Sequence, residues 1–247
     1  YFMTDSNQSN LIISDSKSAW FRATILFILA LIGTVGMWSV VVFIPDIERE
    51  FNLDRGTSSL LYAFTMIGFG FGTVAIGKIY DKFGIKKPIL LATIVLIACY
   101  YLYSIFPFYW QFLTLQFFMG FAASAFFGPA MADISNYFNK QRGFALSIVA
   151  SANYVAGATW PLLIGYFLKF IDWRTTHFWI SICLLIMIPL ILLLKNASVD
   201  ESKFQDTKQR YKDIKLNLSN NQIQVLLMLA GICCCVALSL IHISEPT

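Results

Sequence analysis

Residues 77–87 read GKIYDKFGIKK, a short charged segment between two long runs that carry no charged side chain, 56–77 and 88–132. A helix rises about 1.5 Å per residue, so about 20 apolar residues cross a hydrocarbon core about 30 Å thick. The first run is long enough to cross a membrane once, and the second is long enough to cross it twice. Gly84 permits a tight turn, and the lysines favour the cytoplasmic side. The segment therefore predicts a cytoplasmic turn between two transmembrane helices.

The composition of the 247-residue chain also favours a membrane protein. Hydrophobic residues make up 57% and charged residues 13% of the chain, whereas soluble domains carry about 25% charged residues. The charge-free runs predict an all-α integral membrane fold with seven candidate helices. Pro45 is expected to end the first helix, and Pro107 to separate the third from the fourth. The predicted helices are 21–44, 57–78, 88–106, 109–132, 143–168 and 176–194, with a seventh that begins near 223.

Lysine and arginine are distributed unevenly between the two sides of this predicted membrane topology. The side that holds the N-terminus carries fourteen of the 18 Lys and Arg residues, and the other side carries four. Cytoplasmic loops carry the excess of these residues. We therefore expect a multi-pass protein of the cell (inner) membrane with a cytoplasmic N-terminus and the lipid bilayer as its partner.

The distribution of polar residues predicts the domain organisation. The long apolar stretch is flanked by a polar head and by a charged segment, which indicate a tail and a linker. The last ten residues, LSLIHISEPT, resemble the in-frame translation of a sequencing-library adapter, and we expect them to be an artefact. The expected parts are a disordered cytoplasmic tail (1–19), a six-helix transmembrane bundle (20–195), a cytoplasmic linker (196–222), the start of a seventh helix (223–237) and the artefact (238–247).

Other classes of protein are disfavoured by the sequence. The five cysteines lie in predicted helices without the spacing of a metal knuckle or a disulfide framework, so we expect no metal, cofactor or catalytic residue. The basic residues form no stripe, which disfavours a nucleic-acid partner. A six-helix channel or a membrane enzyme is the alternative from another class. A channel needs a re-entrant filter, and an enzyme needs a His, Asp and Glu cluster; the sequence shows neither pattern.

Residues 77–87 fill every specified position of the pattern G-x-x-x-D-[RK]-x-G-x-[RK]-[RK]. This resembles the signature loop of the major facilitator superfamily, and the helix count and the charged segment after the sixth helix fit the first half of that family. The resemblance implies a fragment of a twelve-helix parent. It also implies a secondary transporter, not an enzyme, that moves a small solute by alternating access through a midplane site between two halves.

In that family the loop locks the cytoplasmic side when the transporter faces outward. The resemblance implies that Asp81 caps a helix of the missing half and that Lys82 or Lys86 pairs with Asp133. Arg142 is expected to join this cluster, although ordinary loop solvation is the alternative for Asp133 and Arg142. The implied gating residues are Gly77, Asp81, Lys82, Gly84, Lys86, Lys87, Asp133 and Arg142.

Polar groups at membrane depth need a partner or a water-filled cavity, which makes them candidates for a substrate site. Packing between helices is the alternative, because an interhelical hydrogen bond contributes only about 0.6 kcal/mol. Asn153 is the first candidate. Gln116 stands where many proton-coupled members of the family place an arginine, and Trp160 replaces the glycine that precedes Pro161 in an antiporter motif. His177 is expected to be solvated at the outer end of the sixth helix. The candidates are Trp38, Tyr62, Gln116, Asn153, Tyr154 and Trp160.

Small residues recur at intervals of four on several predicted helices, among them Gly68 and Gly72, and Gly120, Ser124 and Gly128. Such spacing places them on one helix face, where they allow two helices to approach closely in lipid. We expect them to be packing positions.

The stretches at 136–148, 157–161 and 172–174 resemble the branch of the superfamily that includes monocarboxylate transporters and oxalate/formate exchangers. This resemblance implies a small organic anion, a monocarboxylate or a dicarboxylate, as the substrate. A transporter of the same fold for a drug or a sugar is the alternative. The coupling ion stays open, because the predicted membrane-embedded part holds no carboxylate to carry a proton.

Overall fold

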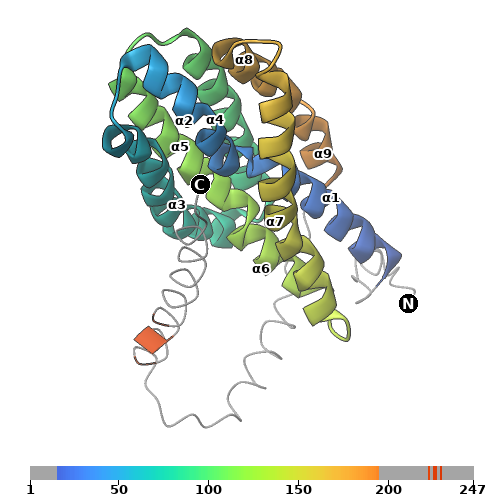
Figure 1. Cartoon of the computed structure of the whole chain (residues 1–247). Helices are drawn as coiled ribbons and strands as arrows, with labels where there is room; N and C mark the ends of the chain where they lie inside the picture. Colours follow the sequence, from blue (N-terminus) through green and yellow to red (C-terminus); the bar gives the residue numbers. More distant parts are fainter. Residues whose placement is uncertain (1–15, 195–221, 223–224, 227–228, 230–247) are drawn as a thin grey trace, which may run out of the picture. The chain divides into compact units, whose positions relative to one another are not determined.

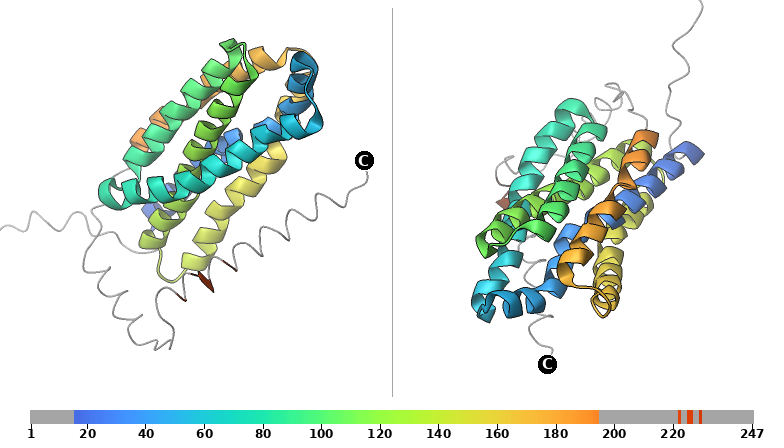
Figure 2. Two further views of the ribbon diagram at one scale, coloured as in Figure 1. Left: turned by 90° about the vertical axis from the view of Figure 1, so that its left-hand side faces the viewer. Right: turned by 90° about the horizontal axis from the view of Figure 1, so that it is seen from above.

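The computed structural model describes residues 16–194 and, further along the chain, residues 222, 225, 226 and 229. Within these residues the secondary structure is helical and contains no strand. Figures 1 and 2 show α1–α9 packed as one bundle. The elements are α1 (Lys17–Gly33), α2 (Val35–Phe51), α3 (Arg55–Phe83), α4 (Lys86–Ile105), α5 (Tyr109–Ala123), the 3₁₀ turn η2 (Ser124–Phe126), α6 (Gly128–Tyr137), α7 (Arg142–Phe167), α8 (Trp173–Leu184) and α9 (Met187–Leu193).

These elements form six helical spans that are long and apolar enough to cross a membrane. The prediction of an all-α membrane bundle is confirmed. Three of the spans are composite, because α1 and α2, α5 to α6, and α8 and α9 each follow one another with only a local break. The spans are Lys17–Phe51, Arg55–Phe83, Lys86–Ile105, Tyr109–Tyr137, Arg142–Phe167 and Trp173–Leu193.

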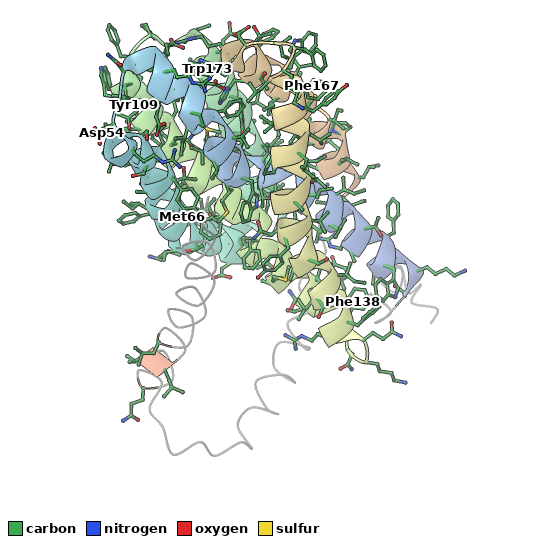
Figure 3. All side chains as sticks on the ribbon, viewed as in Figure 1. Asp54, Met66, Tyr109, Phe138, Phe167 and Trp173 are labelled. Carbon is green, nitrogen blue, oxygen red and sulfur yellow. The ribbon has the colours of Figure 1, made fainter. Side chains whose placement is uncertain are left out.

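The bundle has two chemically different ends. The basic end contains the start of α1, the α3–α4 turn and the α6–α7 turn, where most of its lysines lie. The opposite end contains the α2–α3, α4–α5 and α7–α8 turns. Figure 3 shows Asp54, Tyr109 and Trp173 at the opposite end and Phe138 at the basic end.

The first span differs from the prediction at three places. It begins at Lys17, so residues 17–19 are helical and not part of a tail; the Ser16 hydroxyl accepts a hydrogen bond from Ala19 N and caps the helix. Pro45 lies inside α2 and does not end it, because proline removes only one helix hydrogen bond. The span is interrupted instead at Thr34, between α1 and α2, which lie on one line in Figure 1.

The charged segment 77–87 is more helical than predicted. α3 continues to Phe83, five residues beyond the predicted end, and α4 begins at Lys86. Lys82 in the last turn of α3 complements the negative end of the helix dipole, which favours this extension. The turn itself is only Gly84 and Ile85, and Gly84 has φ +72°. The prediction that glycine makes this turn is confirmed.

Most of the remaining expected domains lie outside the described residues. These are the tail up to residue 15, most of the linker at 196–222, most of the predicted start of a seventh helix at 223–237, and the adapter-like end at 238–247. The few described residues in this part of the chain, Gln222, Val225, Leu226 and Leu229, are helical.

α3 and α5 approach each other closely at their glycines. A Cβ atom added to Gly72 would lie 2.5 Å from the Phe121 carbonyl oxygen, and one added to Gly68 would overlap the Phe117 carbonyl oxygen. From the other side, a Cβ at Gly120 would overlap the Thr65 carbonyl oxygen. The two backbones touch at Gly68, Gly72 and Gly120, as the spacing of four predicts, whereas a Cβ added to Gly128 would meet no described atom within 4 Å.

Candidate functional site

A buried ion pair lies near the basic end of the bundle. Arg22 Nε lies 2.6 Å from Asp133 Oδ2, and Arg22 Nη2 donates to Asp133 Oδ1 over 2.9 Å. The two side chains are only 7% and 8% exposed, and the guanidinium lies 4.4 Å above the Tyr137 ring centre. A bidentate pair of this kind joins α1 to α6 with defined geometry.

The predicted partners of Asp133 are wrong. Its carboxylate binds Arg22 of α1 and not Lys82 or Lys86 of the charged segment. The lysines of that segment lie around the α3–α4 turn, where Lys82 and Lys87 approach the Phe83 ring at 5.3 and 4.3 Å. From the sequence alone, Arg22 is only one of the fourteen Lys and Arg residues on the side of the N-terminus. A signal was available, because this arginine directly precedes a run of apolar residues on the same helix.

The other predicted gating residues remain at the basic end. Asp81 lies in the last turn of α3 and is exposed, and Lys86 Nζ lies 3.5 Å from the Leu192 carbonyl. Arg142 is exposed as the first residue of α7. A Cβ at Gly77 would meet no described atom within 4 Å. The structure therefore presents Asp81 and Arg142 on the surface, and does not pair them with the buried Arg22 and Asp133.

Two tryptophans connect the first span to α7 near the break at Thr34. Trp38 Nε1 donates to Asn153 Oδ1 over 3.1 Å, and the Trp38 ring lies 3.0 Å from where a Cβ of Gly157 would be. Trp160 Nε1 donates to the Leu31 carbonyl over 2.8 Å. Leu31 lies in the last turn of α1, where carbonyls lack helix donors of their own.

Gln116 lies in the core between α3, α4 and α5. Its side chain accepts a hydrogen bond from Thr65 Oγ1 over 2.9 Å and donates one to the Tyr103 hydroxyl over 3.3 Å. The residue is 1% exposed, so these contacts favour packing between helices over a position in a substrate cavity. By contrast, Tyr62 and Tyr154 are exposed, at 37% and 62%.

The expectation of a solvated His177 is wrong. The residue is 1% exposed, because α8 packs on α4 and directs the ring into an aromatic cluster. The imidazole stacks on Tyr103, with ring centres 4.5 Å apart, and lies 4.0 Å from the Phe43 ring. Its Nδ1 lies 2.8 Å from the Trp173 carbonyl oxygen. The ring closes the core at the opposite end of the bundle.

A second ion-paired cluster joins three spans at the opposite end. Arg174 donates to Glu50 Oε1 over 2.6 Å and to the Phe106 carbonyl over 2.7 Å. Trp173 Nε1 donates to the second Glu50 oxygen over 2.8 Å. Sequence reasoning noted residues 172–174 only as a resemblance. The first span is thus held by a charged contact near each of its two ends.

Asp172 begins α8 as its N-cap, and its carboxylate accepts a hydrogen bond from Thr175 N over 3.0 Å. Hydrogen bonds from Thr175 lower the pKa of this carboxyl group below its ordinary value. We expect Asp172→Ala to lower the free energy of unfolding by about 1 kcal/mol. A carboxyl group with a lowered pKa stabilises the fold when ionised, and this contribution is lost as the pH falls through the folded pKa.

Asp172→Asn keeps a side-chain oxygen that can cap α8 but removes the charge. The difference in stability between wild type and this variant should therefore shrink below about pH 4. Thermal unfolding of the two proteins at several pH values measures this difference. A difference that stays constant or grows on acidification would contradict the assignment.

The described residues offer no metal centre, since no group of three or more His, Cys, Asp or Glu side chains among them could hold an ion. The candidate residues instead form three regions: the charged turn at the basic end, the polar contacts near the break in the first span, and the surface around Tyr62.

Comparison with known proteins gives matches along most of the chain. The family model described as the Major Facilitator Superfamily matches residues 26–244. The chain is 28% identical over 156 residues to the agnestins efflux protein AgnL12 of Paecilomyces divaricatus, which covers 61% of this chain and 35% of that protein. It is 28% identical over 167 residues to the MFS-type transporter pynF of Aspergillus niger, covering 65% of this chain and 38% of that one.

A bacterial relative is also similar. The benzoate transport protein of Acinetobacter baylyi is 24% identical over 197 residues, which is 76% of this chain and 42% of that protein. These three matches therefore each span less than half the length of the relative.

Proposed function

The chain belongs to the Major Facilitator Superfamily, and from this premise we propose that it forms the first six-helix half of a secondary transporter. In such a transporter a small solute binds near the membrane midplane between two halves, which rock to expose the site to each side in turn. The observation that carries the proposal is the family match together with the six membrane-length spans.

The spans are buried to different extents, which supports the proposal that a second six-helix half packs against the open ones. In the most apolar 18 residues of Arg55–Phe83 and Arg142–Phe167, only 28% and 22% are buried, against 61% in Tyr109–Tyr137. Polar or aromatic residues lie on these open helices, including Tyr62 on α3 and Tyr154 on α7. We propose that these two residues face the solute pathway, whereas Trp38 and Asn153 shape its wall through their mutual hydrogen bond.

For the substrate we propose a small organic anion. The resemblance of 136–148, 157–161 and 172–174 to carboxylate transporters supports this class, as does the similarity to a benzoate transport protein. Drug efflux is the second candidate, because relatives include efflux proteins. The two differ in direction and solute, so uptake of labelled carboxylates into proteoliposomes separates them.

The gate is proposed at the basic end, which we place in the cytoplasm. The exposed position of Asp81 at the end of α3 leaves its carboxylate available to cap a helix of the second half. Gly84 sets the turn that follows, and the adjoining lysines surround it. Asp133 has a different role from the one first expected, because Arg22 neutralises it inside the first half.

We expect Asp81→Asn in the complete reading frame to reduce uptake of a transported carboxylate by about tenfold, which corresponds to about 1.4 kcal/mol. The matched control is Asp46→Asn, another carboxylate near a span end, which contacts Arg49 at 3.9 Å at the opposite end. Uptake into proteoliposomes, normalised to inserted protein, measures the effect. Equal uptake by the two variants would contradict the gate, and failure of the wild type to move any solute would contradict the transporter.

A further inference from the structure

A hollow of about 270 Å³ lies between α2 and the start of α3, at the opposite end of the bundle. One of its walls is aliphatic and comes from the second half of α2. The other wall is polar and comes from the first two turns of α3. The residues that carry its chemistry are Val41, Ile44 and Pro45 on α2, and Arg55, Ser59 and Tyr62 on α3.

Arg55 is the charged group of this hollow. Its side chain is 85% exposed, and its Nη1 atom lies 3.8 Å from Glu48 Oε2, beyond hydrogen-bond length. Glu48 is held by another donor, since it accepts a hydrogen bond from the Ser58 hydroxyl. Arginine presents five donors in a planar fork that matches a carboxylate. The guanidinium can therefore bind an incoming anion without first breaking a close ion pair with Glu48.

The second nearby carboxylate is engaged as well. Asp54 caps α3 and accepts hydrogen bonds from Thr57 N over 3.1 Å and from Thr57 Oγ1 over 2.6 Å. Thr57 thereby lowers the pKa of the Asp54 carboxyl group. The negative charges of Glu48 and Asp54 repel a bound anion. Removing one of these charges should therefore strengthen anion binding.

Pro45 is part of the aliphatic wall. Proline has no N–H and cannot donate the helix hydrogen bond to the carbonyl four residues before it, which here is Val41. Val41 and Pro45 both line the hollow. At this wall Pro45 therefore contributes apolar surface and no backbone N–H donor.

We propose that this hollow is a binding subsite for an organic anion with an apolar body, in which Arg55 binds the carboxylate. The hydroxyls of Ser59 and Tyr62 complete the polar wall, and the side chains of Val41 and Ile44 contact the apolar part. The proposal rests on the proposed transport function and assigns the subsite to the mouth of the pathway opposite the lysine-rich turn. Solute would bind here before it reaches the midplane.

The experiment compares two arginines in the complete protein, with benzoate as the probe and uncharged benzamide as its size-matched counterpart. Arg55→Gln should raise the KM for benzoate uptake about tenfold, the loss expected when a charge-assisted hydrogen bond is removed, with little change in the maximal rate. Arg49→Gln is the control, because Arg49 is 82% exposed and lies 3.9 Å from Asp46, yet does not line the hollow.

Glu48→Gln provides a test in the other direction. It keeps an oxygen that can accept from Ser58 but removes the negative charge beside Arg55, so the KM for benzoate should fall. Thermal stabilisation of each purified protein by benzoate gives an independent measure of binding. Benzamide should stabilise wild type and Arg55→Gln equally.

The outcomes separate the subsite from the transporter. The subsite would be overturned if Arg55→Gln and Arg49→Gln had equal KM values for benzoate. It would also be overturned if benzoate neither stabilised the wild-type protein nor was taken up by it. Uptake of a different solute by that wild type would leave the transport function standing, whereas the absence of transport of any solute would overturn both.

Discussion

Asp133→Ala is expected to lower the free energy of unfolding by about 3–5 kcal/mol, because it removes the carboxylate that pairs with the buried Arg22 guanidinium. Both side chains are less than a tenth exposed, and the pair is bidentate. The Tyr137 ring face can contribute a cation–π interaction, but one of about 1–2 kcal/mol does not replace a carboxylate. Unfolding of the purified chain in mixed micelles titrated with SDS measures the loss.

The chain offers a matched control for this prediction. Asp81→Ala removes the same side chain at the same end of the bundle, but Asp81 is exposed. Surface substitutions usually change stability by less than about 0.5 kcal/mol. The double variant Arg22→Met with Asp133→Leu should recover most of the stability, since apolar side chains can replace a buried pair. If Asp133→Ala and Asp81→Ala unfold alike, the pair does not contribute as the geometry indicates.

The Arg22–Asp133 pair could not be predicted from the sequence. The spans themselves were predictable, because uninterrupted apolar length is a property of the chain alone. The choice of partner for Asp133 was not predictable, because it depends on how α1 and α6 are rotated about their axes. The same holds for Glu50 and Arg174, which lie far apart in the sequence and meet only after the bundle has formed.

For the candidate substrate residues, too, the sequence predicts one property and not another. The depth of a residue in the membrane can be estimated from its position within an apolar run, and this identified Gln116, Asn153 and Tyr62. The direction in which a side chain points cannot be estimated in this way. In the structure Gln116 points into the core toward Thr65, whereas Tyr62 lines a hollow. From the sequence alone, Arg55 is only one of the four Lys and Arg residues on the side opposite the N-terminus. Its proximity to the apolar wall of α2 becomes visible only when the α2–α3 turn is placed.

The predicted helix boundaries were wrong for a different reason. Charge was used to end each predicted helix, yet a helix can carry charged residues in its last turns, where they reach the polar interface. α3 therefore extends through Lys78, Asp81 and Lys82. Proline was used in the same way at Pro45, although a single lost hydrogen bond is tolerated in a packed span.

Gly68→Ala is expected to destabilise the bundle by about 2–3 kcal/mol, at the upper end of the usual range for overpacking. The added methyl group would overlap the Phe117 carbonyl oxygen, and a backbone atom cannot move away by changing a rotamer. α3 and α5 would have to separate, and their other contacts, including that of Gly120 with the Thr65 carbonyl, would loosen. The measurement is again SDS-titrated unfolding of the purified chain.

Gly70→Ala is the control that makes this argument specific. Gly70 lies on the same helix, two residues away, and an added Cβ meets no described atom within 4 Å. Alanine favours a helix over glycine by about 1 kcal/mol, so Gly70→Ala should leave stability unchanged or raise it. Both substitutions gain the same helix propensity, and their difference therefore isolates the contact between α3 and α5. If the two variants were equally stable, the α3–α5 backbone contact would not be what the glycine at position 68 provides.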